Sequence, residues 1–468
     1  MTQILNIPGD ENIRSVMPGG IKDLEIFIDV YHRRSRIEIT EIVNEISIYE
    51  NIFNPVLSGW LSVIDNSGML STFPFIGQEN LTFVWERDER LITRSFKIIE
   101  VDDVSSATTG TGAYVLKFIS EEQFINSFSL FSRAYEGFPQ EIIAEIYEEF
   151  FGGEIEMLTE YETEVAIAFP WIKPLQAIHM ITKNMLAIDG TPSFLFPRFY
   201  EETPALASYR LMLEEEPITT VNQKRITNQG TDDGITENVL DEIRNQIYDQ
   251  LISSAFDMSK SISSGALAST STVIDLTSKK IRRNDFDYRE NAPPISVDWV
   301  YDLFGHNGVP IYKLPLTKNI MTIQNNKAFD TGFPNLTGDD EFEDQIMNSW
   351  KNRMNIIDVK VNMDSIAFTL DEKIPFSIGK VIEYILPVFA PPTQQLQTTE
   401  WKNKIVSGKY LVSAINHNIN QKVYTMSIQL IKDGLGEEAN LYAGSETTFD
   451  LVANTGLSID QAIRAQTG

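Results

Sequence analysis

Short apolar runs separated by turn residues fill the first quarter of the chain. Between Leu24 and Ser120, β-branched and aromatic residues gather in runs such as LEIFIDVY, RIEITEIV and AYVLKFIS, with Gly, Asn, Asp and Ser between them. Runs of this length and composition are typical of antiparallel strands. The pattern predicts a small antiparallel barrel or sandwich.

A helical period replaces the strand pattern after Glu121. In PQEIIAEIYEEFF, Pro139 suits a first helical turn and Gly152 a helix stop. The apolar residues on one face of this segment are Ile142, Ile143, Ile146, Tyr147 and Phe150. The segment therefore predicts a helix of about three turns.

Two later segments repeat apolar residues at helical spacing. The first follows FPWIKP and carries Leu175, Ile178, Met185 and Ile188, and SFLFPRFY after it is typical of a strand. The second is DDEFEDQIMNSWKNRM, which carries Phe342, Ile346, Trp350 and Met354. Acidic residues occupy its first turn, where the helix dipole favours them. These elements predict an α+β layer beside the barrel.

The stretch 217–285 has the weakest pattern. Ile243, Ile247 and Leu251 recur at fourfold spacing, and a run rich in Ser, Thr and Ala follows, SKSISSGALASTSTV. We interpret this stretch as a peripheral helix with a flexible linker.

Part of the first barrel is written a second time between Ile356 and Lys432. The segment FPFIG precedes the strand LTFVW, and IPFSIG precedes KVIEYIL. A two-strand unit follows each, FKIIEVDDV with AYVLKFIS and YLVSAINHN with YTMSIQLIK. The positions predicted to be equivalent are Phe75 with Phe376, Phe96 with Tyr410, and Tyr114 with Tyr424. A chance likeness of two antiparallel hairpins is the alternative.

Bulk composition narrows the class of protein. A chain of 468 residues has room for about two to four domains. The 38 basic and 66 acidic side chains give a formal charge of -28, which disfavours specific nucleic-acid binding. The absence of cysteine excludes disulfides and suits folding in a reducing cytoplasm. The start lacks a secretion-signal pattern and no apolar run is long enough to cross a bilayer, so we expect a soluble protein without membrane association.

The candidate chemical groups have ordinary structural interpretations. Glu141, Glu145, Glu148 and Glu149 alternate with apolar residues and predict a solvated helix face rather than the acid/base pair of a glycan hydrolase. The acidic run at 339–344 lacks the ligand spacing of an EF-hand and predicts a helix start.

The histidines and tryptophans point the same way. His179 and His417 have no G-x-S-x-G type motif nearby. Phe169, Trp171 and Trp350 occupy positions typical of core residues. We assign no catalytic, cofactor-binding or metal-binding residue.

The order of elements along the chain resembles the baseplate hub protein of contractile-tailed, T4-like bacteriophages, over roughly residues 22–433. The local matches are the pair Pro170-Trp171 that opens a helix, the aromatic strand Ser193 to Phe196, and the terminal hairpin YLVSAINHNINQKVYTMSIQLI. The stretches 217–285, 387–404 and the tail after Gly434 depart from that pattern.

The resemblance implies a multidomain α+β fold with two tail-tube-like antiparallel β-barrels and an inserted α+β layer. The expected divisions are an N-terminal arm (1–21), the first barrel (22–121), the α+β domain in two parts (122–202 and 286–338), a strand of the second barrel (203–216), the inserted helix and linker (217–285), a helix with the second barrel (339–433), and a C-terminal tail (434–468).

The resemblance also implies a function. In the family, three identical chains form a ring that presents six barrels to the six-fold tail tube and holds the three-fold central spike, and the ring continues the DNA channel. The expected partners are further copies of the chain, tube subunits, the spike and other baseplate proteins, with DNA passing without specific binding. Such a protein is not an enzyme, needs no cofactor, and belongs to the virion tail baseplate, assembled in the bacterial host cytoplasm.

Several alternatives stay open at this point. One is a tail-associated peptidoglycan or glycan hydrolase, and another is a spike or receptor-binding fibre, although no long β-helical or shaft repeat is present. A hub from a phage-like injection machine is the nearest neighbour within the leading class. We also hypothesise that part of the negative charge lines the channel and keeps DNA from sticking.

Overall fold

The computed structural model describes most of the chain. The described residues are 22–30, 35–73, 75–87, 90–106, 111–223, 246–255, 258–276, 279–293, 295, 318–324, 340–354, 356–364, 376–386, 406–420 and 423–434. The expected N-terminal arm, the loop 387–404 and the tail after Gly434 lie outside these ranges.

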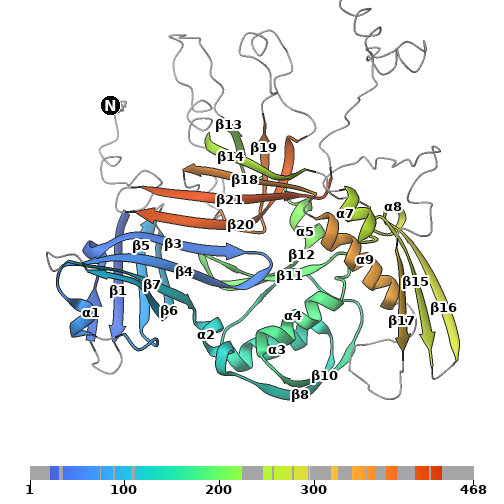
Figure 1. Ribbon diagram of the computed structural model, residues 1–468. Coiled ribbons are helices and arrows are strands. Elements are labelled where there is room, and N and C mark those ends of the chain that lie inside the picture. Colours follow the sequence, from blue (N-terminus) through green and yellow to red (C-terminus); the bar gives the residue numbers. More distant parts are fainter. Residues whose placement is uncertain are drawn as a thin grey trace, which may run out of the picture.

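One sheet of 13 strands dominates the structure (Figure 1). Its strands, in spatial order, are β19 (Val381–Ile385), β13 (Thr220–Gln223), β14 (Gln246–Ala255), β18 (Ile357–Asp364), β21 (Tyr424–Lys432), β20 (Gly408–Asn420), β3 (Val43–Asn51), β4 (Asn54–Asp65), β7 (Gly112–Ser120), β6 (Arg90–Ser106), β5 (Asn80–Arg87), β1 (Lys22–Val30) and β2 (Ser35–Glu38). Within it lie the short helices η3 (Thr40–Ile42) and α1 (Met69–Thr72). Most neighbouring strands are antiparallel, as the sequence pattern predicted.

The expectation of two separate closed barrels is wrong. β19 also pairs with β20, so the six strands from β19 to β20 in this order form a closed cycle of pairings. The other seven strands end in an edge at β2 within the described residues, and β3 is joined directly to β20. The cause is the length of β20, which pairs with β19 near Leu411 and with β3 from Ala414 onward. The two strand groups are therefore halves of one continuous sheet: the first half holds strands β1 to β7, and the second half holds β13, β14 and β18 to β21.

An α+β unit lies below this sheet in Figure 1. It holds the pair β8 (Phe131–Gly137) with β10 (Val165–Ile172), and the sheet β11 (Ser193–Arg198), β12 (Glu201–Ser208) and β9 (Glu156–Met157). Its helices are α2 (Glu121–Phe128), α3 (Pro139–Phe151), α4 (Pro174–Asn184) and α5 (Tyr209–Glu214). The helix predicted after Glu121 is confirmed as α3, and the helix predicted after FPWIKP is confirmed as α4. Because α4 ends at Asn184, Met185 and Ile188 lie beyond it, and Ile188 is exposed rather than part of an apolar helix face. β12 was expected in the second barrel, but it pairs with β11 and β9 instead.

A third layer lies beside α4. The strands β16 (Lys280–Asp287), β15 (Ala268–Asp275) and β17 (Asn319–Gln324) form a sheet with α7 (Met258–Ser263), α8 (Tyr288–Asn291) and α9 (Asp340–Arg353) around it. α9 confirms the helix predicted in DDEFEDQIMNSWKNRM.

The interpretation of 217–285 as a helix with a flexible linker is wrong in the residues described. Residues 246–255 form strand β14, which pairs with β18, and the Ser- and Thr-rich run forms α7 and β15. Residues four apart share a face in a strand as well as in a helix, so the spacing of Ile247 and Leu251 did not distinguish the two.

Two hydrophobic cores hold these layers. The larger contains the inner faces of both halves of the main sheet, and it also takes in residues of the β11–β12 hairpin and Trp350 of α9. The smaller is built from α3, α4 and the β8–β10 pair. Strand β7 shows the alternation that one buried face requires, with Tyr114, Leu116 and Phe118 all inside. None of the described helices has the length and apolar character needed to cross a membrane.

Candidate functional site

The two halves of the main sheet meet along β20 and β3. These strands pair antiparallel over seven residue pairs, from Ala414 opposite Asn51 to Asn420 opposite Glu45. Backbone pairing of this length fixes the position of one half against the other. The junction is therefore the natural place to look for side chains that hold the architecture together.

A buried polar chain lies at this junction. The Nε2 atom of His417 on β20 lies 3.2 Å from Oε1 of Glu50 on β3, and its Nδ1 lies 2.6 Å from the hydroxyl of Tyr424 on β21. The Tyr424 hydroxyl in turn lies 2.7 Å from that of Tyr200. The side chains of Glu50 and His417 are both fully buried. Buried polar groups need hydrogen-bond partners, and these side chains supply them to one another. The network therefore fixes the position of β3 against β20 and β21.

The turn between β11 and β12 is inserted into the same place. The backbone N–H of Phe199 donates to Oε2 of Glu50 at 3.0 Å. The Phe199 ring lies 4.3 Å from the His417 ring and stacks at 5.2 Å on Trp85 of β5. Phe199 is completely buried. The α+β unit thus contacts both halves through one aromatic wedge.

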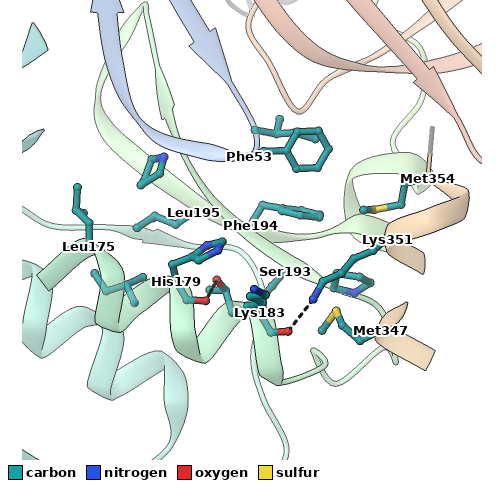
Figure 2. Close-up of a pocket in the computed structure, with 15 residues that line it drawn as sticks. Phe53, Leu175, His179, Lys183, Ser193, Phe194, Leu195, Met347, Lys351 and Met354 are labelled. Carbon is teal, nitrogen blue, oxygen red and sulfur yellow. Dashed lines mark hydrogen bonds between the residues drawn. The ribbon is translucent and has the colours of Figure 1, made fainter. Parts of the chain in front are cut away.

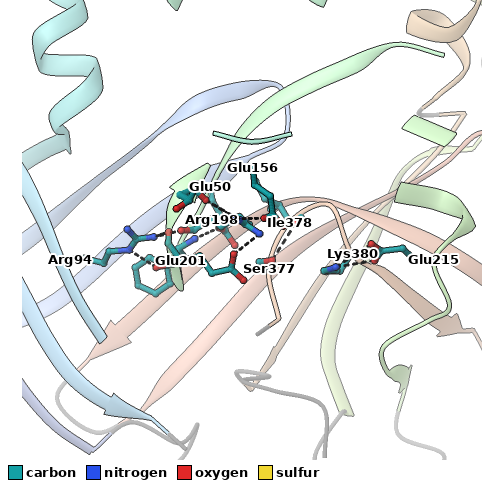
Figure 3. Close-up of polar contacts among 11 residues, drawn as sticks. Glu50, Arg94, Glu156, Arg198, Glu201, Glu215, Ser377, Ile378 and Lys380 are labelled. Carbon is teal, nitrogen blue, oxygen red and sulfur yellow. Dashed lines mark hydrogen bonds and ion pairs between the residues drawn. The ribbon is translucent and has the colours of Figure 1, made fainter. Parts of the chain in front are cut away.

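Arg94 of β6 fixes the wedge from the other side (Figure 3). Its Nε donates to the carbonyl of Phe199 at 2.7 Å, and its guanidinium also contacts the carbonyls of Arg198 and Glu201. Burial lowers the pKa of Arg94, and the carboxylates of neighbouring glutamates, including Glu50, partly offset this. A single cation therefore joins the first half to the β11–β12 hairpin, whose turn contacts both halves.

Ion pairs extend this polar region along the hairpin. Arg198 Nη2 lies 2.6 Å from Oε2 of Glu156 on β9, and its guanidinium also pairs with Glu201. Lys380, just before β19, lies 3.0 Å from Glu215 after α5. Figure 3 shows both sets of contacts: the Arg198 pairs lie within the α+β unit, and the Lys380–Glu215 pair joins that unit to the second half of the sheet.

Glu50 was not singled out from the sequence, and His417 was considered only as an ordinary structural histidine, although each left a signal of a buried polar contact. Glu50 lies on the same strand face as the buried residues Ile46 and Ile48. His417 lies between Ile415 and Ile419 on one face of β20. A charged or titratable residue at an inward position of a strand requires a buried partner. The signal gives the need for a partner, but it does not identify that partner.

The residues predicted as repeat equivalents all face the main core. Phe376, Tyr410 and Tyr424 are fully buried, and Phe96 and Tyr114 nearly so. Phe75 is partly buried and packs against the core, with its ring 6.4 Å from that of Tyr114. The structure brings Phe75 and Tyr114 together, whereas the second set lies in the other half of the sheet.

Trp171 does not occupy the core position that was expected for it. Phe169 and Trp350 are buried, but the Trp171 side chain is 74% exposed and its φ is 43°. A bulge between Phe169 and Ile172 in the pairing of β10 with β8 turns the intervening residues outward. The expectation holds for two of the three aromatic residues and is wrong for Trp171.

The carboxylates considered for catalysis lie on the solvent side of α3. Glu141, Glu145, Glu148 and Glu149 are exposed, and Glu149 makes an ion pair with Arg133 of β8. In the part of the chain that the structure describes, no three His, Asp or Glu side chains are placed to hold a metal ion. This arrangement offers a solvated helix face and no enclosed acid/base pair.

A pocket of about 290 Å³ lies where the β3–β4 turn, α4, β11 and α9 converge (Figure 2). Its wall is mainly apolar, with Phe53, Phe194 and Met347 among the lining residues. His179 and Lys183 lie on one side, and the Nζ of Lys351 donates to the carbonyl of Lys183 at 3.1 Å. Burial and the two lysines lower the pKa of His179. The described lining residues include no carboxylate that could act with this histidine as an acid/base pair.

Two solved structures have the same overall arrangement. A tail protein from Neisseria meningitidis MC58 matches with a TM-score of 0.51 and 10% sequence identity, covering 88% of this chain and 98% of that chain. The fold is that of tail proteins. The 43 kDa tail protein of prophage MuSo2 from Shewanella oneidensis matches with a TM-score of 0.50 and 8% identity, covering 88% of this chain and all of that one.

Sequence comparison adds nothing to this result, since no protein-family model and no curated protein matches the chain. The resemblance drawn from the order of elements is therefore confirmed at the level of the fold.

Proposed function

We propose that this chain is a structural subunit of a bacteriophage tail baseplate, a hub that forms a trimeric ring between the six-fold tail tube and the three-fold central spike. The fold shared with two tail proteins supports a structural tail role. The observation that carries the finer proposal is an internal duplication of the main sheet. Three copies of a chain with two similar halves present six similar units, which matches both symmetries.

The order of strands supports the duplication. In the first half, the consecutive strands β4, β5, β6 and β7 lie in the spatial order β4-β7-β6-β5. In the second half, the consecutive strands β18, β19, β20 and β21 lie in the spatial order β18-β21-β20-β19. Every neighbouring pair in both sets is antiparallel.

A bulge gives a common reference point in both halves. The pairing of β6 with β7 shifts between Ile98 and Glu100, and that of β20 with β21 shifts between Val412 and Ala414. Just before the bulge, the Ile98 N–H donates to the Glu79 carbonyl, and the Val412 N–H donates to the Lys380 carbonyl, each at 2.9 Å. Two strands that carry the same irregularity at the same place support common descent rather than chance likeness.

Counting from this bulge relates the predicted positions. Phe96 and Tyr410 each lie two residues before it, and they pair with Leu81 and Ile382 at corresponding places. Phe75 precedes Leu81 by the same number of residues as Phe376 precedes Ile382, so these two phenylalanines also correspond. On the neighbouring strand, the count aligns Tyr114 with Met426, two residues from Tyr424 on the same face.

The hub assignment includes partners and location. We propose that the ring binds tail tube subunits, the spike and other baseplate proteins in the virion, after assembly in the host cytoplasm. We further propose that part of its negative charge faces the DNA channel, where like charge would prevent adhesion. The proposal keeps the domain boundaries given by the resemblance, except for residues 203–216 and 217–285, whose strands pair differently from what was expected.

The mass of the purified chain tests the proposal. Native mass spectrometry is expected to give three times the 53.1 kDa of the chain. A stable monomer would contradict the ring. The alternative, a tail-associated peptidoglycan or glycan hydrolase, predicts release of glycan from cell walls that a single substitution such as Glu149→Gln abolishes.

A further inference from the structure

We propose that successive chains of the ring are joined by strand pairing between the second part of β6, Glu100–Ser106, and β14, Asp249–Ala255, of the next copy. This inference rests on the proposed ring and names the surface that closes it. Inside one chain, β20 of the second half pairs with β3 of the first half, and the duplication supplies an equivalent of each strand in the other half.

The β20 side of the junction has an equivalent in β6. β20 pairs with β19 before its bulge, and after the bulge Ala414–Asn420 pairs with β3. β6 likewise pairs with β5 up to Lys97. After the bulge, Glu100–Ser106 has the same length as Ala414–Asn420, but within the described residues it pairs with β7 alone. In the described part of the chain, this segment is the counterpart of the junction strand and has a neighbour on one side, β7.

The β3 side has an equivalent in β14. The pairing of β3 with β4 shifts between Val43 and Glu45, and that of β14 with β18 shifts between Ile247 and Asp249. Each register shift lies just before the segment that starts at Glu45 in β3 and at Asp249 in β14. Glu45–Asn51 of β3 pairs with β20 as well as with β4, whereas Leu251–Ala255 of β14 pairs only with β18 among the described residues.

The exposed side chains on these two segments fit an interface. Leu251 is 61% exposed and Val104 is 60% exposed. They lie on β14 and β6, and the strands β18, β21, β20, β3, β4 and β7 lie between these two in the sheet. Figure 1 shows β14 and β6 on opposite sides of the junction, so the two edges cannot meet within one copy. Strand edges that pair with no second strand among the described residues, and that carry exposed apolar side chains, favour pairing with another chain.

The register follows from the internal junction. Asn418 of β20 lies opposite Ser47 of β3. Ser47 pairs with Trp60, and Leu251 with Lys360, at corresponding positions of β4 and β18, so Leu251 takes the place of Ser47. Val104 takes the place of Asn418.

The bulge at Asp103, whose φ is 51°, permits a shift of one residue on β6. We therefore expect Val104 or Ser105 to lie opposite Leu251. The Ile52 N–H donates to the Ser413 carbonyl, so alternation makes the position of Asn418 and Ser47 a non-hydrogen-bonded pair. Such pairs bring Cα atoms to about 4.5 Å, within the range that a disulfide spans.

The absence of cysteine makes this a clean cross-linking experiment. The single variants Val104→Cys, Ser105→Cys and Leu251→Cys would be made, oxidised alone, and oxidised after co-expression in pairs. A head-to-tail interface predicts no disulfide dimer for any single variant, and a dimer for Leu251→Cys with one of the other two. The matched control is Leu91→Cys co-expressed with Ile281→Cys, two sites that are 73% and 71% exposed and are expected to give no dimer.

The double variant in one chain separates this inference from the ring itself. Oxidation of Val104→Cys/Leu251→Cys, or of Ser105→Cys/Leu251→Cys, is expected to give a covalent series that stops at three chains. A trimer by native mass with no cross-link from either pair would overturn the strand pairing and leave the ring standing. Cross-linking that stops at another number would support the pairing and overturn the three-fold ring. A monomer without cross-links would overturn both.

Discussion

His417 Nε2 lies 3.2 Å from Glu50 Oε1, although the two residues are 367 positions apart in the chain. Each comes from a different half of the main sheet, and both side chains are fully buried. Glu50 also accepts the Phe199 N–H from the α+β unit. One carboxylate therefore connects three parts of the molecule, and its removal should affect all of them.

We expect Glu50→Ala to lower the free energy of unfolding by about 3 kcal/mol, because it leaves the His417 ring and the Phe199 N–H without their buried acceptor. Glu50→Gln keeps an acceptor oxygen and should cost less. Urea unfolding followed by tryptophan fluorescence measures both. Glu45→Ala, at the end of the same strand, is the control and should stay within about 0.5 kcal/mol. Equal losses for Glu45 and Glu50 variants would contradict this role.

Arg94→Lys should loosen the β11–β12 turn. A lysine keeps the charge, but its compact ammonium group lacks the planar guanidinium fork that contacts the carbonyls of Arg198, Phe199 and Glu201 together. We expect faster hydrogen exchange in 196–203, by about tenfold or more, with little change in α3. Uniform acceleration across the whole chain would instead indicate a general loss of stability. Arg133→Lys, an exposed cation of β8, is the matched control and should leave 196–203 unchanged.

The sequence predicted local structure better than long-range contacts. Helices α3, α4 and α9 followed from apolar residues at helical spacing, because these faces cover a core and periodicity records that directly. Strand β14 was missed because a fourfold spacing fits a strand as well. The joining of the halves through β20 and β3 could not be predicted, since strand patterns give the buried face but not the neighbouring strand.

The site shows the same limit. Glu50 and His417 were detectable as polar residues at inward strand positions, but nothing local pairs residue 50 with residue 417. The prediction that Trp171 lies in the core was wrong for a different reason. The bulge in β10 turns its side chain outward, and a bulge leaves no periodic signal in the sequence of one strand.

Truncation of Trp350 should lower stability far more than truncation of Trp171. Trp350→Ala removes a side chain that is 1% exposed and should lower the free energy of unfolding by about 3 to 5 kcal/mol. Trp171→Gly removes an exposed ring and relieves a positive φ, so we expect a change below about 1 kcal/mol. Chemical denaturation of both variants gives the comparison. A large loss for Trp171→Gly would show that the ring packs after all.

Asp65 should make stability depend on pH at the end of β4. Burial tends to raise the pKa of its carboxyl group, but hydrogen bonds from Ser67, Gly68 and Leu70 outweigh it and hold the pKa below the ordinary 3.8. The Ser67 N–H and hydroxyl donate to Oδ1 at 2.8 and 2.9 Å, and the Leu70 N–H donates to Oδ2 at 3.2 Å. The charged form of Asp65 is thus favoured in the folded state.

The sign of the effect follows from that direction. A carboxyl group whose pKa is lower in the folded than in the unfolded chain contributes stability above its unfolded pKa, and this contribution is lost as the pH falls through the folded pKa. Asp65→Asn should therefore destabilise the protein at pH 7, and the difference from the parent should shrink below about pH 4. Urea midpoints of the two proteins at pH 7, 5 and 3 measure it. Asp29→Asn, at a half-exposed position of β1 where Asp29 lies 3.6 Å from Arg36, is the control and should show a smaller difference at every pH. A gap between Asp65→Asn and the parent that widens on acidification would contradict the role given to these hydrogen bonds.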